Sequence, residues 1–163
     1  MSDDWIREQA KRHSDEDGRR RQEAEEHGEA ERRRLEITNR QFPQLWNAFG
    51  DAIRRKSELY NSQYGSQVVY VEVHADRITL RASRLDVTLS AVLYVGTDKR
   101  GILSEYQKAR GNSIGKGNLP GAPTLWLDGD TLTFRRVPDH GSAGSLTPDD
   151  AADSVIQAIV KEL

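Results

Sequence analysis

A stretch of alternating apolar and polar residues, from position 67 to position 95, constrains the fold of this chain more than any other feature. Its apolar side chains recur at every second position in three runs: Val69, Val71, Val73, then Ile78, Leu80, Ala82, and then Val87, Leu89, Ala91, Leu93, Val95. A period of two is typical of β-strands with one buried face and one solvated face. The stretch therefore predicts three consecutive strands of one sheet.

Short turns between these runs predict antiparallel pairing. A two-residue turn at Ala75-Asp76 would keep the apolar side chains of both flanking strands on one face, through the pairs Val73 with Ile78, Val71 with Leu80 and Val69 with Ala82. Turns at 97–100 and at Gly129-Asp130 predict further strands, the last hairpin pairing Leu125 with Phe134. We expect an α+β fold whose antiparallel meander has five to six strands.

Two segments have the spacing of amphipathic helices that pack on this sheet. The first is expected at 43–62, with Pro43 as its start, and its apolar face is Phe42, Leu45, Trp46, Phe49, Ile53, Leu59 and Tyr60. This helix is available to cover the second face of the sheet; alternatively, its aromatic residues bind a partner helix. The second is expected at 147–163, with Thr147 as N-cap and an apolar stripe of Ala152, Val155, Ile156, Ile159 and Leu163.

The N-terminal residues, 1–40, have a different composition from the globular domain expected over 41–163. Residues 1–34 hold 11 acidic and 9 basic side chains, many with an opposite charge four positions away. Each such pair adds about 0.2–0.5 kcal/mol to a helix, whereas Gly18 and Gly28 each cost up to about 1 kcal/mol relative to Ala. We expect a charged helical arm, or a disordered one that becomes helical on contact with a partner.

Site chemistry is weakly represented in the sequence. The chain has no cysteine, and its histidines (His13, His27, His74 and His140) are not at metal-ligand spacing. No motif of a nucleophile, a paired acid and base, or a cofactor site is present, so we predict no catalytic residue, metal or cofactor. The net charge of −2 argues against general nucleic-acid binding. Without a membrane-spanning apolar run or a secretory signal, a cytoplasmic protein is expected.

The glycine-rich segment 108–123 is the best local candidate for anion binding. Its glycine amides could converge on a phosphate, with nearby cations adding charge; the residues concerned are Lys108, Arg110, Gly115, Lys116 and Gly117. The segment departs from a P-loop because its glycines are spaced one residue too closely and Gly117 replaces the magnesium-binding hydroxyl. A simple hairpin connection is the favoured interpretation, and nucleic-acid or phosphate-ligand binding is the alternative function.

The leading functional prediction is a non-enzymatic protein-interaction or assembly module. In this reading the charged arm engages a partner protein or a second copy of the chain. The candidate contact residues are large apolar side chains of the arm, of the first amphipathic helix and of the last hairpin: Trp5, Ile6, Trp46 and Trp126. Trp126 points away from the apolar positions of its strand; if no helix covers that side, it becomes a contact candidate together with Tyr70, Val92 and Tyr94.

Overall fold

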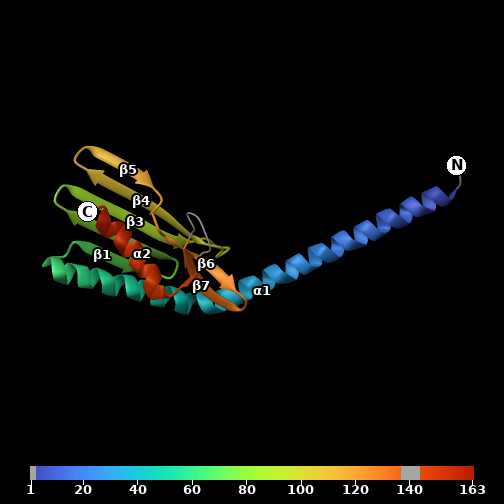
Figure 1. Cartoon of the computed structure of the whole chain (residues 1–163), viewed down its shortest axis with the longest axis horizontal. Helices are drawn as coiled ribbons and strands as arrows, with labels where there is room; N and C mark the ends of the chain where they lie inside the picture. Colours follow the sequence, from blue (N-terminus) through green and yellow to red (C-terminus); the bar gives the residue numbers. More distant parts are fainter. Residues whose placement is uncertain (1–2, 137–143) are drawn as a thin grey trace. The chain divides into compact units, whose positions relative to one another are not determined.

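A computed structural model describes residues 3–136 and 144–163 of the chain, and these residues form an α+β fold (Figure 1). The elements in chain order are α1 (Asp3–Tyr64), β1 (Val69–Val73), β2 (Arg77–Arg84), β3 (Val87–Val95), β4 (Ile102–Arg110), β5 (Ser113–Gly117), β6 (Pro123–Asp128), β7 (Thr131–Arg136), β8 (Ser145–Leu146) and α2 (Pro148–Lys161). The chain divides into two compact units, Met1–Glu36 and Ile37–Leu163, and α1 contributes residues to both.

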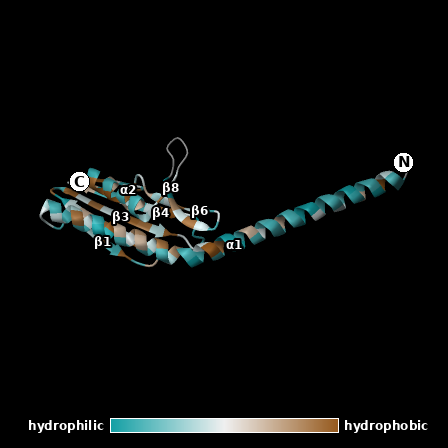
Figure 2. Cartoon of the chain, turned by 60° about the horizontal axis from the view of Figure 1, so that its bottom comes forward, coloured by the Kyte–Doolittle hydropathy of each residue, from teal (hydrophilic) through white to brown (hydrophobic). Residues whose placement is uncertain are grey.

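From Asp3 onward, the unit Met1–Glu36 is helical and mainly hydrophilic (Figure 2). Every side chain from position 3 to position 30 is exposed except that of Gln9, which is half-buried. Ion pairs run along the helix surface, including the expected Arg12–Glu8 pair at 3.4 Å and an Arg19–Glu23 pair at 3.7 Å. Each exposed pair contributes only a few tenths of a kcal/mol, so this helix depends on many small local terms.

The larger unit contains a five-stranded antiparallel sheet in the order β1-β2-β3-β4-β5, which confirms the predicted meander. The predicted register between β1 and β2 is also confirmed, since Val69, Val71 and Val73 lie opposite Ala82, Leu80 and Ile78. The last hairpin has the predicted pairing of Leu125 with Phe134. It forms a second sheet, β6-β7-β8, because β8 pairs with the far edge of β7.

The helix through Pro43 corrects one prediction from the sequence. Pro43 lies inside α1 and does not start a new helix. Proline has no N–H to donate to the carbonyl four residues earlier, so the helix loses one internal hydrogen bond there. Phe42 and Trp46 are both buried and stack on each other at 5.3 Å between ring centroids. Burial of these aromatic rings on both sides of Pro43 accounts for the continuity of the helix.

Both helices pack on the same face of the five-stranded sheet, which we call the inner face (Figure 1). The buried sheet residues all belong to that face, and they form one core with Trp46, Phe49 and Ile53 of α1 and with the apolar stripe of α2. The Nε1 atom of Trp46 donates a hydrogen bond of 2.8 Å to the carbonyl oxygen of His74. Of the two arrangements that the sequence left open, the first helix therefore packs beside α2 in one core and does not cover the second face.

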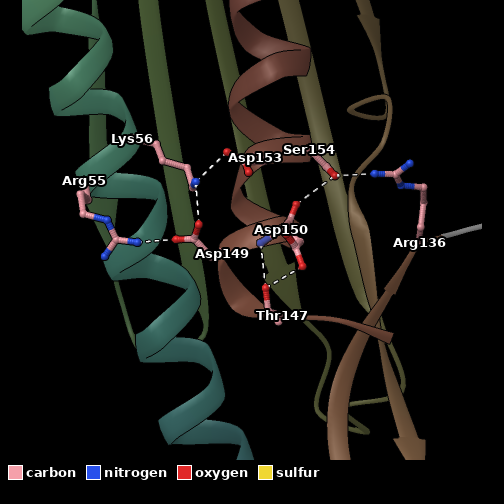
Figure 3. Close-up of polar contacts among 8 residues, drawn as sticks. All are labelled: Arg55, Lys56, Arg136, Thr147, Asp149, Asp150, Asp153 and Ser154. Atoms are coloured by element: carbon pink, nitrogen blue, oxygen red, sulfur yellow. Dashed lines mark hydrogen bonds and ion pairs between the residues drawn. The ribbon is translucent and has the colours of Figure 1, made fainter. Parts of the chain in front are cut away.

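The start of α2 matches the sequence prediction in detail. The Oγ1 atom of Thr147 accepts a hydrogen bond of 3.1 Å from the backbone N–H of Asp150, and Pro148 occupies the first turn. Ion pairs then join α2 to α1: the Lys56 ammonium lies 2.9 Å from Asp149 and 2.6 Å from Asp153, and Arg55 also contacts Asp149 (Figure 3). These contacts set the axial position of α2 against α1.

Candidate functional site

The face of the five-stranded sheet opposite α1 and α2, which we call the outer face, is built by residues at alternate positions of β1 to β5. Strand pairing aligns them in four rows that cross the sheet. In order along the strands these are the Ile114 row (Ser83, Thr88, Ala109, Ile114), the basic row (Tyr70, Arg81, Ser90, Gln107, Lys116), the acidic row (Glu72, Thr79, Val92, Glu105) and the Leu103 row (Arg77, Tyr94, Leu103).

Large apolar side chains of the outer face are open to solvent. Tyr70 is 49% exposed, Leu103 is 53% exposed and Ile114 is 61% exposed. Val92 and Tyr94, near the middle of the sheet, are half-buried by their neighbours on the same face. The inner face differs sharply, because its residues on β2 and β3, such as Ile78 and Leu93, are fully buried. The outer face is therefore amphipathic and uncovered at these positions.

Charge on the outer face is separated by row. Arg81 and Lys116 are exposed members of the basic row, which contains no acidic side chain. Glu72 and Glu105 are exposed members of the neighbouring acidic row, which contains no basic side chain. The two rows are adjacent, so two cationic side chains in one row lie next to a row that holds two anionic side chains.

Two hollows indent the outer face. One has a volume of about 290 Å³ and lies among Tyr70, Glu72, Thr79, Arg81, Ser83 and Thr88, over β1 to β3. The other has a volume of about 280 Å³ and includes Ser90, Val92, Glu105, Gln107 and Lys116, over β3 to β5. Both hollows have basic and acidic groups at their rims, and each is large enough to receive a side chain from another molecule.

The predicted anion-binding residues are not brought together. Lys108 is on the inner face and forms a 2.6 Å ion pair with Glu162, whereas Lys116 is on the outer face. Arg110 pairs with Asp86 at 3.5 Å. Most of the segment predicted as a connecting loop is strand: Gly111, with a φ of +54°, makes a tight turn, and Gly115 and Gly117 pair with β4. Backbone pairing to β4 therefore occupies the glycines that were expected to form an anion cradle.

The four predicted contact residues lie in different environments. Trp46 is 1% exposed and belongs to the core, so its side chain is not accessible to a partner. Trp126 is 47% exposed and lies under the Arg135 guanidinium at 4.4 Å, but it belongs to the β6-β7-β8 sheet. It therefore does not share a sheet face with Tyr70. Trp5 and Ile6 are 58% and 60% exposed in the unit Met1–Glu36.

Sequence reasoning missed several outer-face residues, namely Glu72, Arg81, Leu103, Glu105, Gln107 and Ile114. Their signal was present as the polar positions of the period-two pattern, but grouping them into rows requires the strand register. Their importance also depends on which face the helices cover. Neither fact can be read from the periodicity of a single strand.

Two hydroxyl groups are the polar side-chain atoms of interest in the core. The hydroxyl groups of Ser57 and Tyr106 are buried without a hydrogen-bond partner among the described residues. Burial raises the pKa of Tyr106, and the negative charge of the nearby Glu162 carboxylate raises it further. The Tyr106 hydroxyl therefore stays protonated at neutral pH. No group of three or more acidic or histidine side chains in the described part of the chain is placed to hold a metal ion. His140 lies outside the described residues.

Comparison with family models, curated proteins and solved structures finds no match to this chain. No helix in residues 3–136 or 144–163 is long and apolar enough to cross a membrane. The geometry of the outer face is therefore the main basis for a functional interpretation.

Proposed function

We propose that this chain is a non-enzymatic protein-interaction module whose docking surface is the outer face of the β1-β2-β3-β4-β5 sheet. The observation that carries the proposal is the exposure of Tyr70, Leu103 and Ile114 on a face that neither α1 nor α2 covers. These three side chains lie in different rows, each among polar or charged neighbours. Exposed aromatic and aliphatic side chains surrounded by polar groups are typical anchors of protein-binding sites. The separated charges beside it would give a docked protein a preferred orientation.

The charged helical unit supplies a second, smaller contact surface in this proposal. Trp5 and Ile6 are adjacent large apolar residues in a unit that otherwise exposes mainly charged side chains. Aromatic residues contribute strongly to binding when a partner desolvates them. The proposal includes a cytoplasmic location, which the lack of cysteine favours but does not require.

Site-specific photo-crosslinking tests this function. A photoreactive phenylalanine analogue placed at Leu103 should crosslink to protein in cells of the source organism. The matched control is Leu85, which is 89% exposed in the turn between β2 and β3 and does not belong to the outer-face rows. We expect discrete crosslinked bands from position 103 and none from position 85. Equal crosslinking at both positions, or none at position 103, would contradict the proposed function.

A further inference from the structure

The row pattern of the outer face identifies a partner by its chemistry. We propose that a second copy of this chain docks on the outer face, face to face, about a twofold axis that runs across the strands between the basic row and the acidic row. This inference rests on the proposed function, because it uses the same docking surface. It follows from three properties of that surface, which are its charge rows, its apolar corners and its area.

The charge rows are complementary to themselves under this rotation. A twofold axis between them turns the sheet over and places the basic row of each copy on the acidic row of the other. Arg81 then lies beside Glu72 of the second copy, one strand away, and Lys116 lies beside Glu105 in the same manner. In a twofold interface each contact occurs twice, so the arrangement brings together four pairs of opposite charges.

The apolar corners match under the same rotation. The Ile114 row of one copy falls on the Leu103 row of the other, since these rows lie on either side of the charged rows. Ala109 and Leu103 share β4, so they come to face each other, with Ile114 on the neighbouring strand. Thr88 and Tyr94 share β3 and meet in the same way. The exposed Leu103 and Ile114 side chains are thereby removed from water together.

The other face-to-face rotation is less favourable. A twofold axis parallel to the strands would place each row on its own counterpart, so the basic row would meet a basic row. Arg81 would then approach Lys116 of the second copy, and Arg77 would cover Leu103. Like charges brought together in an interface oppose association. The charge distribution therefore selects the axis across the strands.

The area is sufficient for a weak but specific dimer. The four rows hold sixteen residues, each of which takes about 4.8 Å across the strands and about 6.8 Å along them, so the rows cover about 520 Å² on each copy. Burying this surface on both copies removes about 1,040 Å² from water, which is below the area of standard stable interfaces and in the range of weak, transient ones. Aligned sheets pack about 10 Å apart with a relative rotation of about 30°, which leaves the two hollows to accept the long side chains.

Sedimentation velocity of the full chain over a range of concentrations tests this arrangement with a charge swap. Arg81→Glu and Glu72→Lys should each weaken the dimer at least tenfold in Kd. The double variant Arg81→Glu with Glu72→Lys should recover most of the loss, because each copy then offers the reversed pair. Arg54→Glu, which reverses an exposed charge on α1, is the matched control and should leave the Kd unchanged.

The orientation is tested separately, because the chain has no cysteine of its own. Lys116→Cys places one thiol on β5, and the proposed axis puts the two thiols above the same strand pair. A short bis-maleimide should then link two copies, whereas the axis parallel to the strands would separate the thiols by about four strand spacings, roughly 19 Å, across the sheet. A dimer that gives no such link has a different geometry, and the proposed axis is wrong.

The outcomes separate this inference from the proposed function. A chain that stays monomeric at all concentrations, or a dimer indifferent to both single reversals, refutes docking of a second copy on this face. If position 103 still crosslinks to a different protein, the proposed function stands and its partner is another molecule. If position 103 crosslinks to no protein, both are refuted.

Discussion

Gly50 allows a close approach of α1 to β1, and its substitution tests the packing of the larger unit. A Cβ atom at position 50 would lie 2.6 Å from Cγ1 of Val73 and 3.1 Å from its Cγ2. Alanine gains up to about 1 kcal/mol over glycine in helix propensity. Overpacking of a well-packed core typically costs about 1–3 kcal/mol, and the β-branched Val73 has little freedom to move aside. A contact of 2.6 Å places the overpacking cost in the upper part of this range, about 2–3 kcal/mol, so Gly50→Ala should lower the free energy of unfolding by about 1–2 kcal/mol after the propensity gain.

The assay is urea denaturation followed by tryptophan fluorescence, since Trp46 is buried in the same core. Gly28→Ala is the matched control: it is the same substitution in the same helix, and no atom lies within 4 Å of its added Cβ. This control should increase helicity without loss of stability. In the double variant Gly50→Ala with Val73→Ala the clash is relieved, so the two changes should couple by about 1 kcal/mol or more. A Gly50→Ala variant as stable as the parent, or strictly additive changes, would refute the reasoning.

Four further predictions concern the ion pairs of Lys56, the hydrogen bonds of Asn61 and the start of the core. The Lys56 ammonium lowers the pKa of Asp149, so the ion pair stabilises the fold at pH values above the ordinary carboxyl pKa. This stabilisation is lost as pH falls through the lowered pKa, and Asp149→Asn should flatten the acid limb of a stability–pH curve. Hydrogen bonds that Lys56 donates, chiefly to Asp153, raise the pKa of Lys56. Its contribution to stability is therefore present below pH 10.5 and is lost as pH rises past the raised value, so alkaline unfolding of Lys56→Met should show a reduced slope. The Asn61 side chain hydrogen-bonds both the N–H and the carbonyl oxygen of the first β1 residue, so Asn61→Ala should lower the free energy of unfolding in urea by about 1–3 kcal/mol. The control Asn47→Ala, at an exposed position, should leave it unchanged. Removal of residues 1–34 should shift the melting temperature by only a few degrees in calorimetry, because the core begins at Ile37; loss of the cooperative transition would contradict this.

Local interactions were readable from the sequence. The period-two runs predicted the strands and the β1–β2 register because a one-residue shift would move a whole apolar set into water. The α2 start was readable because Thr147, Pro148 and the following acids act within a single turn. The charged character of the first unit followed from composition alone. Each of these properties depends on residues within a few positions of one another.

Only the tertiary structure decided which element each apolar helix face and each strand edge contacts. The sequence showed that α1 has an apolar face, but the core determined that this face packs beside α2 on the inner side of the sheet and continues through Pro43. The last hairpin joins β8 in a sheet of its own, and its separation from the β1-β2-β3-β4-β5 sheet was decided by which strand edges meet in the folded chain.

The candidate site itself shows the same division. The sequence determined that each strand has polar residues on one side, because alternation is a property of one strand. Only the folded sheet decided that Arg81 and Lys116 share a row, that Glu72 and Glu105 share the next, and that Leu103 stays exposed. The physical reason is that a row is made by residues from different strands, so it exists only when the backbone hydrogen bonds of the sheet have aligned them.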